Sequence, residues 1–390
     1  MRVNHLSLSD FRNYVSAEID LAPGPNLFIG RNGQGKTNLV ESLAYLSTLG
    51  SHRVSTDQAL IRQGQDSAIV RARVASGDRE LLVEVQLNRT GANRGQVNRS
   101  AIRTRELPRY FSSVLFAPED LALVRGEPSV RRRFLDQLLV QRNPRFSGIF
   151  ADYDRVLRQR NSLLKSARSS GVREGQLSTL DIWDERLISL GSEIIDARVA
   201  LIELLGAPLG SAYRAVVGDD HRPKLAAELS VLGADPEDGV ERADASSEIV
   251  VPSTSDRPSV ASLFGDALRR LRKRELERGI TLAGPHRDDV LFELNGLPAK
   301  GYASHGESWS FALALKLASA ELLRRDSTTG DPVLILDDVF AELDQSRRRM
   351  LALAVRDYEQ VLITAAVLAD VPVELTAHTV QIEAGEIVDG

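Results

Sequence analysis

The chain has no cysteine among its 390 residues, which excludes disulfide bonds and zinc sites built on thiolates. It has no apolar run of about 18 residues, the length that a membrane-spanning helix needs, so we expect no membrane contact. The N-terminus, with Arg2, His5 and Asp10, is too polar for a secretory signal. These absences together predict a cytoplasmic protein.

Aromatic residues make up only 5% of the chain and the formal net charge is −5, so the chain as a whole lacks the positive field of a nucleic-acid binder. Any contact with DNA must therefore come from a local basic patch that binds phosphates rather than stacks on bases. Hydrophobic residues, by contrast, make up 43% of the chain, which is enough for a sizeable core and for two lobes.

The sequence at 30–37, Gly-Arg-Asn-Gly-Gln-Gly-Lys-Thr, matches the P-loop pattern G-x-x-x-x-G-K-[ST]. A short apolar run at 25–29 precedes it and leucines at helical spacing follow it, so we expect the strand, loop and helix that the pattern requires. Glycines let backbone N–H groups surround phosphate oxygens, and the helix N-terminus favours the same anion. The pattern therefore predicts an ATP site formed by Gly30, Arg31, Asn32, Gly33, Gln34, Gly35, Lys36 and Thr37.

Within this site Lys36 would contact the β and γ phosphates, a catalytic contribution, and Thr37 would ligate Mg²⁺. A second motif, the apolar run 333–336 followed by Asp337 and Asp338, is typical of a buried parallel strand with charges at its carboxyl end. We expect Asp337 to hold Mg²⁺ through water and Asp338 to orient or deprotonate the attacking water. About 300 residues separate the two motifs, which predicts a nucleotide domain split around an insertion.

The tetrapeptide Ser304-His305-Gly306-Glu307 precedes a stretch of small and apolar residues at helical spacing. Ser304 is suited to cap that helix, with Glu307 as the other half of a capping box, and this alone would explain the sequence. The alternative adds a ligand, because the Ser304 hydroxyl, the Gly306 N–H and the helix dipole could bind the γ-phosphate of an ATP held by a second copy of the chain. The physics of the sequence by itself favours the simple cap.

The insertion between the two ATP motifs has its own organisation, with helical spacing over 128–206. Apolar residues in steps of three and four from Leu180 to Leu204 form a heptad seam, for which 145–165 could supply an antiparallel partner helix. A segment rich in Asp, Glu, Ser, Pro and Gly at 233–259 predicts a surface loop. The other elements that we expect are a β region at 67–116, helices at 262–278, 307–325 and 344–357, and strands at 290–294, 333–336 and 361–365.

Two clusters of basic residues could supply a DNA contact. The residues proposed for it are Arg131, Arg132 and Arg133 in the first cluster and Arg270, Lys273 and Arg274 in the second. A third group, in the β region, consists of Arg94, Arg99, Arg103 and Arg105. Each group could equally be an ordinary solvated face, although the second places like charges at i,i+4 spacing, which such faces usually avoid.

With these motifs in this order, the chain resembles the RecF family of bacterial recombination and gap-repair ATPases. That family is part of the wider ABC-type group that includes the heads of SMC and Rad50. The resemblance runs from end to end of the chain. It is carried by the motifs above and by the blocks LSDFRNY at 8–14, SHR at 51–53, FAPEDL at 116–121, GPHRDD at 284–289 and LDDVFAELD at 336–344.

The resemblance implies an α/β fold, namely an ABC-type P-loop ATPase head with a mixed sheet, helices and an antiparallel β subdomain, and an inserted helical arm lobe. We expect the head in residues 1–140 and 281–390, and the arm lobe with a short antiparallel coiled coil in 141–280. The resemblance also implies ATP and Mg²⁺ as cofactors, slow hydrolysis, and an ATP-dependent homodimer in which ATP lies between Lys36 of one copy and Ser304 of the other. Implied partners are DNA with single-stranded gaps or junctions, RecR and RecO, in recombinational gap repair, replication restart and the SOS response.

Two other functions were weighed against this one. The energising subunit of a membrane transporter would have an LSGGQ signature and a switch histidine, whereas this chain has Ser304-His305-Gly306-Glu307 and Thr364-Ala365-Ala366. Transporters also follow the first strand-end acid with Glu, where this chain has the shorter Asp338, a difference that fits slow turnover. A scaffold that binds ATP without hydrolysing it, and so loads recombination mediators, has the same motifs as a slow ATPase. The sequence leaves these last two open.

Overall fold

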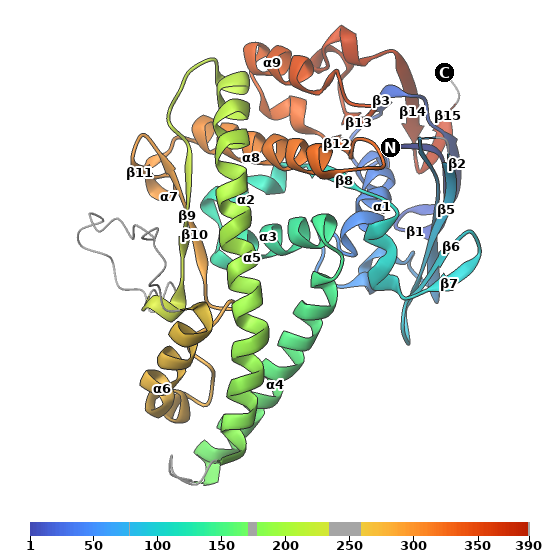
Figure 1. The fold of residues 1–390 in the computed structure, drawn as a ribbon. Helices are drawn as coiled ribbons and strands as arrows, with labels where there is room; N and C mark the ends of the chain where they lie inside the picture. Colours follow the sequence, from blue (N-terminus) through green and yellow to red (C-terminus); the bar gives the residue numbers. More distant parts are fainter. Residues whose placement is uncertain (78, 171–177, 234–258, 389–390) are drawn as a thin grey trace.

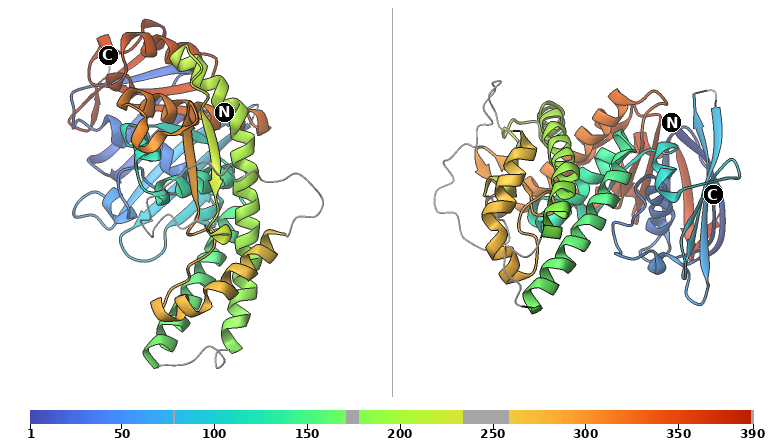
Figure 2. Two further views of the ribbon diagram at one scale, coloured as in Figure 1. Left: turned by 90° about the vertical axis from the view of Figure 1, so that its left-hand side faces the viewer. Right: turned by 60° about the horizontal axis from the view of Figure 1, so that its bottom comes forward.

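The computed structural model describes residues 1–77, 79–170, 178–233 and 259–388. The predicted loop at 233–259 therefore lies almost wholly outside the described residues. Figure 1 shows two sheets on one side of the molecule, helices on the other, and an arm of helices that extends downwards. Figure 2 shows the antiparallel sheet and the arm at opposite sides, with the central sheet and α1 between them.

The central sheet is mostly parallel and has the strand order β15-β14-β3-β13-β12-β8. Parallel sheets are buried on both faces, which explains the continuous apolar runs in the sequence and confirms the strands predicted at 25–29, 333–336 and 361–365. Its strands are β3 (Gly24–Ile29), β8 (Ser113–Phe116), β12 (Val333–Asp337), β13 (Gln360–Ala365), β14 (His378–Glu383) and β15 (Glu386–Val388). β14 and β15 were not predicted.

A second sheet is antiparallel and packs against one face of the central sheet through a shared core that includes α1 (Lys36–Thr48). Ile335 of β12 and Leu43 of α1 lie in that core together with Val70 of the antiparallel sheet. Its strands, in spatial order, are β2 (Tyr14–Asp20), β1 (Arg2–Phe11), β4 (Ser67–Ser76), β5 (Arg79–Asn88), β6 (Arg94–Val97) and β7 (Ser100–Ile102). The short helix η2 (Thr104–Arg109) follows β7.

Helices cover the other face of the central sheet, where Leu334 and Leu336 of β12 point into a separate core. Alternate residues of one strand thus enter two different cores, as the period of a strand requires. The helices on this side are α2 (Leu121–Arg125), α3 (Pro128–Arg142) and α8 (His305–Asp326), with α9 (Gln345–Val355) packed against the long helix α5. A small sheet of β9 (Lys224–Glu228), β10 (Asp289–Leu294) and β11 (Leu297–Pro298) leads into the short α7 (Ala299–Tyr302). Of these elements, α2, β9, β11 and α7 were not predicted.

The arm consists of α4 (Phe146–Ser170), α5 (Ser178–Val217) and α6 (Val260–Arg278) packed together, and so differs from the predicted pair of helices. The three are joined by Arg160, whose side chain is fully buried. Its guanidinium donates to Asp184 Oδ1 of α5 at 2.7 Å and to Glu275 Oε2 of α6 at 2.6 Å. Removing one partner of such a buried group is strongly destabilising, so this network specifies the three-helix arrangement.

The heptad seam predicted along α5 is only partly correct. Leu180, Leu187 and Leu201 are buried as expected, but Leu204 is 38% exposed. Beyond residue 201 the buried stripe moves to Ile202, Leu205, Leu209 and Tyr213. An α-helix turns every 3.6 residues, so a straight helix drifts away from a strict heptad. α5 therefore packs on α4 along its lower half, but on α8 along its upper half, rather than supercoiling throughout.

The block at 284–289 joins the arm to the head and is structural. Arg198 of α5 donates to the Pro285 carbonyl at 2.6 Å, and Asp288 Oδ1 accepts from the backbone N–H and the hydroxyl of Ser230, both at 2.8 Å. Burial raises the pKa of Asp288 to about 6 and lowers the pKa of His286 to about 3. These contacts tie the block to α5 and to Ser230.

Candidate nucleotide site

The loop after β3 has a backbone that only glycine allows at several positions. Gly33 and Gly35 have φ of 82° and 116°, in the left-handed region that L-residues rarely adopt. A Cβ at Gly35 would lie 2.8 Å from Asn13 Nδ2, and one at Gly30 would lie 2.2 Å from the Ile382 carbonyl oxygen. The fold of the loop therefore requires glycine at these positions of the P-loop pattern, and so does the expected ligand.

The loop is held in place by contacts that the sequence did not reveal. The Gln34 carbonyl accepts from the Gly385 N–H at 2.9 Å and from Asn13 Nδ2 at 3.2 Å, and the Tyr14 hydroxyl donates to the Gly35 carbonyl at 3.1 Å. Gly385 lies in the turn between β14 and β15, whereas Asn13 and Tyr14 belong to the N-terminal block that carried the family resemblance. That block was the one available signal for this support.

Lys36 is only 3% exposed, and its Nζ donates to the carbonyls of Gly30 at 2.8 Å and Arg31 at 3.2 Å. Within the described ranges, its ammonium makes no ion pair with a carboxylate. A buried charge that no ion pair neutralises is costly, so the arrangement fits an anionic ligand. Arg31, Asn32 and Gly33 are exposed at the tip of the loop, where backbone N–H groups can reach such a ligand.

Strand register brings the two ATP motifs together at one edge of the central sheet. Thr364 of β13 pairs in register with Phe28 of β3 on one side and with Asp337 of β12 on the other. As a result, Thr37 donates from Oγ1 to Asp337 Oδ1 at 2.9 Å, across 300 residues of sequence. The Thr364 hydroxyl donates to the same oxygen at 2.6 Å.

Hydroxyl and carboxylate oxygens are ligands that Mg²⁺ prefers, and Thr37 with Asp337 supplies one of each. No group of three or more His, Cys, Asp or Glu side chains that could hold a metal occurs in the described part of the chain. Mg²⁺ commonly keeps several waters and binds through one or two carboxylates together with phosphate oxygens. The residues at this edge therefore fit a magnesium ion that binds with a nucleotide.

Asp338 follows β12 with φ of 50°, a strained conformation for a residue with a side chain, of the kind found at functional sites. Its N–H donates to Thr364 Oγ1 at 2.9 Å. Burial raises the pKa of the Asp338 carboxyl, Lys36 opposes the change, and the neighbouring charges of Asp337 and Glu119 add to it. The environment of Asp338 therefore favours uptake of a proton.

Ser304 caps α8, as predicted. Its Oγ accepts from the Glu307 N–H at 3.2 Å, and its own N–H donates to Glu307 Oε2 at 2.8 Å, which together make a capping box. Ser304 is exposed and Gly306 is half-buried. The N-terminal end of α8, which Ser304 caps, lies beside α7, on the other side of the head from α1 (Figure 1).

The first basic cluster needs a correction at Arg131, which is 5% exposed and buried against Asp289. Arg131 Nε and Nη2 donate to the two Asp289 oxygens, each at 2.7 Å, and Nη1 donates to two backbone carbonyls. Each of its three nitrogens donates inside the fold and the side chain is buried, so the prediction that Arg131 contacts DNA is wrong. Arg132 donates to the Asp288 carbonyl at 2.7 Å, whereas Arg133 is exposed. Which face of α3 turns inward was not evident from its arginines.

The second cluster lies on α6, where Arg270, Lys273 and Arg274 are exposed. Its neighbours Arg269 and Arg272 form ion pairs with acidic residues of the arm, Asp266 and Asp184 among them.

No helix in the described ranges combines the length and apolar character that crossing a bilayer requires.

A P-loop and an acidic strand end at one edge of a parallel sheet, with an antiparallel sheet on one face and a helical lobe on the other, define an ABC-type ATPase head. The model of the RecF/RecN/SMC N terminal domain family matches residues 2–380. The DNA replication and repair protein RecF of Leifsonia xyli subsp. xyli is 69% identical over 389 residues, which cover 100% of both chains. The corresponding protein of Clavibacter michiganensis subsp. michiganensis is 67% identical over 100% of this chain and 96% of its own. The chain belongs to the RecF family.

Solved structures agree with this assignment. The recombination mediator protein RecF-ATPrS in the RecFOR pathway has a TM-score of 0.85 at 28% identity, covering 99% of this chain and 97% of that one. The Smc head domain of Pyrococcus furiosus has a TM-score of 0.50 at 14% identity, covering 99% of this chain and 95% of that one, and shows the fold alone. The predicted fold class, an ATPase head with an inserted helical arm lobe, is thereby confirmed.

Proposed function

We propose that this chain binds ATP and Mg²⁺ between its P-loop and Asp337, dimerises through the nucleotide, and uses slow hydrolysis to control its hold on DNA in recombinational gap repair. The observation that carries the proposal is the contact of Thr37 with Asp337 across 300 residues, beside a buried Lys36 without an anionic partner among the described residues. The RecF relatives are DNA replication and repair proteins, and the similar solved chains are RecF with ATP or ATPrS.

The residues at this edge of the central sheet have different roles in the proposed reaction. The P-loop amides and Lys36 orient the triphosphate, and Thr37 and Asp337 hold Mg²⁺, which when bound neutralises charge that develops on the phosphate oxygens. Asp338 orients or deprotonates the attacking water. Thr364 fixes both acids, because its hydroxyl donates to Asp337 while its oxygen accepts from the Asp338 N–H.

The site needs a second copy of the chain for its completion. Ser304 is exposed, and it caps the end of α8 that lies on the other side of the head from α1, so it can approach the nucleotide of a partner (Figure 1). Its oxygen already accepts from the Glu307 N–H, which leaves the hydroxyl proton for donation to a γ-phosphate oxygen. The half-buried Gly306 and the N-terminal end of α8 add a backbone donor and the helix dipole.

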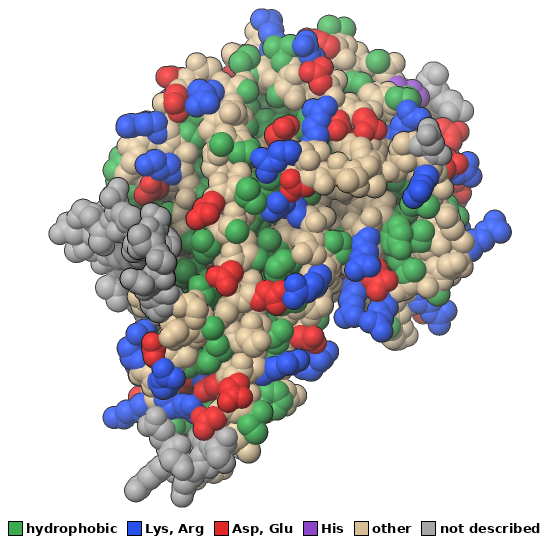
Figure 3. All heavy atoms as spheres, in the orientation of Figure 1, with side chains coloured by type: hydrophobic (Ala, Val, Ile, Leu, Met, Phe, Trp, Pro, Cys, Tyr) green, Lys and Arg blue, Asp and Glu red, His purple; other side chains and the backbone are tan. Residues whose placement is uncertain are grey.

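The basic residues of the β6–β7 hairpin and η2 are the strongest candidates for DNA phosphate contacts. Five arginines there are exposed and form no ion pair with any described residue: Arg94, Arg99, Arg103, Arg105 and Arg109. Figure 3 shows Lys and Arg side chains gathered at the lower right of the head, towards η2 and β7, whereas those of the arm are interspersed with acidic side chains. Cations without a fixed partner lose least when they bind phosphate.

Reversing two of these charges should weaken DNA binding. We expect Arg99→Glu with Arg103→Glu to lower affinity and to reduce the slope of log affinity against log salt by about 2, since each phosphate contact contributes about 0.9. The matched variant is Arg270→Glu with Lys273→Glu, which makes the same change of charge on α6. DNA affinity measured over a range of salt compares the two. If only the α6 variant loses affinity, the arm is the contact surface and the hairpin is a solvated face.

RecR and RecO are proposed as protein partners, because the similar RecF structure is described within the RecFOR pathway. Gapped or junction DNA is proposed as the substrate, in gap repair, replication restart and the SOS response, and work on the bacterial chromosome would place the protein in the cytoplasm. The division into head segments 1–140 and 281–390 around an arm lobe 141–280 likewise stays a proposal.

Sedimentation with ATP, with ADP and without nucleotide, each with and without gapped DNA, tests the proposal. We expect a dimer with ATP alone and a more stable complex when DNA is added. Phosphate release measured in the same samples decides between a switch and a scaffold. Absence of turnover in every sample, with dimerisation intact, would favour the alternative of a non-hydrolysing, nucleotide-gated scaffold that loads recombination mediators.

A further inference from the structure

The loop that follows α1 fixes His52 between two anchored neighbours. The Ser51 hydroxyl donates to Glu41, and its oxygen accepts from the N–H groups of Arg53 at 2.9 Å and Val54 at 3.1 Å. Arg53 Nη1 donates to Asn38 Oδ1 at 2.9 Å. Because Ser51 and Arg53 both contact residues of α1, the backbone of His52 is held beside that helix.

The ring of His52 is directed at the metal-binding carboxylate. Its Nε2 lies 3.7 Å from Asp337 Oδ2, and its side chain is only 14% exposed. Asp337 Oδ1 already accepts from the hydroxyls of Thr37 and Thr364, so the ring faces the other oxygen of the same carboxylate. Neither ring nitrogen of His52 is accessible to solvent or hydrogen-bonded to any residue in the described part of the chain.

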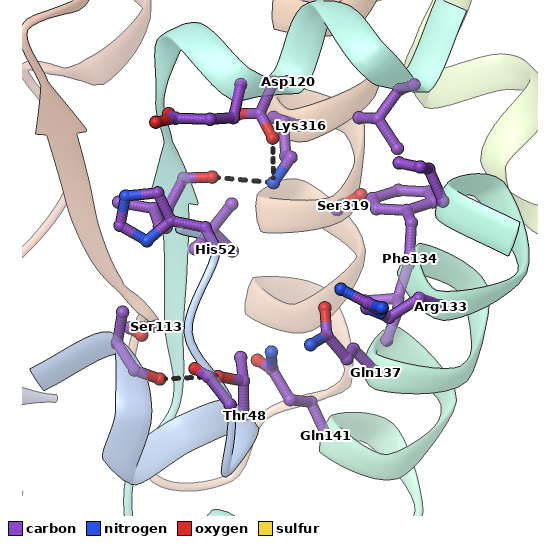
Figure 4. A pocket seen from close by; sticks show the side chains of 18 of the residues that line it. Thr48, His52, Ser113, Asp120, Arg133, Phe134, Gln137, Gln141, Lys316 and Ser319 are labelled. Atoms are coloured by element: carbon purple, nitrogen blue, oxygen red, sulfur yellow. Dashed lines mark hydrogen bonds and ion pairs between the residues drawn. The ribbon is translucent and has the colours of Figure 1, made fainter. Parts of the chain in front are cut away.

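His52 also borders a cavity of about 150 Å³ between the end of α1, β8, α3 and α8 (Figure 4). Lys316 and Asp120, which also line the cavity, form an ion pair with each other. Lys316 Nζ contacts Asp120 Oδ1 at 2.9 Å and the Leu115 carbonyl at 2.8 Å. The cavity gives the ring room to shift, and Glu119 and Arg133 also line it. Asp337 Oδ2, at 3.7 Å from Nε2, is a carboxylate oxygen with capacity to accept a hydrogen bond from the ring.

We propose that His52 is a positioning residue for the ATP site, in which Nε2 donates a hydrogen bond to Asp337 Oδ2, directly or through a water of the Mg²⁺ shell. This inference rests on the proposed ATP and Mg²⁺ binding. The strand end where transporters place their histidine is filled here by Thr364, whose hydroxyl is committed to Asp337 and whose oxygen serves the Asp338 N–H. The loop after α1 supplies the imidazole in its place, as an outer partner that orients the carboxylate.

Three variants test this assignment: His52→Leu, His52→Gln and, as a matched control, His378→Leu. His378 also has a buried ring nitrogen without a partner among the described residues, but it lies at the opposite end of β14 from the P-loop. ATP affinity is measured with Mg²⁺ and with EDTA. We expect His52→Leu to reduce the gain in affinity that Mg²⁺ brings by about 10-fold and to leave affinity in EDTA unchanged. His52→Gln, which keeps an N–H donor, should retain most of that gain, and His378→Leu all of it.

Thermal unfolding without nucleotide separates positioning from a structural role. Buried ring nitrogens without hydrogen-bond partners carry a desolvation cost that a leucine side chain does not, so His52→Leu should unfold at the same temperature as the parent or higher. A clear fall in Tm, or a full Mg²⁺ effect in His52→Leu, would overturn the assignment, and an equal loss in the leucine and glutamine variants would do the same. If the unmodified protein itself gains no ATP affinity from Mg²⁺, the proposed function fails as well.

Discussion

Replacing Lys36 with alanine is expected to weaken ATP binding by about 10- to 100-fold, because a hydrogen bond to a charged group contributes about 1.5–3 kcal/mol. ATP-dependent dimerisation should be lost with it. Lys36 Nζ now contacts only the carbonyls of Gly30 and Arg31, so moving to a triphosphate breaks no ion pair with another described residue. Fluorescence titration with a labelled ATP analogue, followed by sedimentation with ATP, measures both effects.

The control for this variant is a measurement that shows it is still folded. Thr37 and Asp337 make their contact without Lys36, and the backbone of the loop is fixed by Asn13, Tyr14 and Gly385. The far-ultraviolet circular dichroism and Tm of Lys36→Ala without nucleotide should therefore match those of the parent. Dimerisation with ATP at the parental level, in a variant that is folded, would contradict the assignment of the P-loop as the nucleotide site.

The edge of the central sheet that forms the candidate nucleotide site could be predicted from the sequence, because its signals are local. A run such as 333–336, buried on both faces, is apolar throughout, and the acids emerge where the strand ends. Glycines at 33 and 35 are demanded by positive φ. The carboxyl ends of strands in a parallel sheet lie at one edge, and this predicts that Thr37 and Asp337 are close together. The strand between them, β13, matches no catalytic motif in the sequence.

What could not be predicted depends on which surfaces meet. Arg131 is one of three consecutive arginines, and only the packing of α3 on β10 assigns it to Asp289 inside the fold. Leu204 satisfies a heptad but is exposed, because α5 changes its neighbour from α4 to α8. The contact of Ser51 with Glu41, which positions the loop that carries His52, joins two residues that are ten apart in the sequence. No periodic pattern in the sequence predicts that pair.

Replacing Asp338 with asparagine is expected to slow phosphate release by about 100-fold or more, since a positioned general base contributes about that much. Asparagine has nearly the same shape and tolerates the left-handed backbone at this position better than most residues. Burial and the charges of Asp337 and Glu119 already raise the pKa of this carboxyl, so a neutral amide should fit at least as well. Nucleotide binding and dimer formation should persist.

The variant should therefore remain an ATP-bound dimer, because the step that releases the two copies no longer occurs at its normal rate. Sedimentation at successive times after ATP addition would show the parental dimer decaying as nucleotide is consumed, while the Asp338→Asn dimer persists. The Lys36→Ala protein, which forms no dimer, marks the lower limit of the measurement. Turnover at the parental rate in Asp338→Asn would show that another group orients the water.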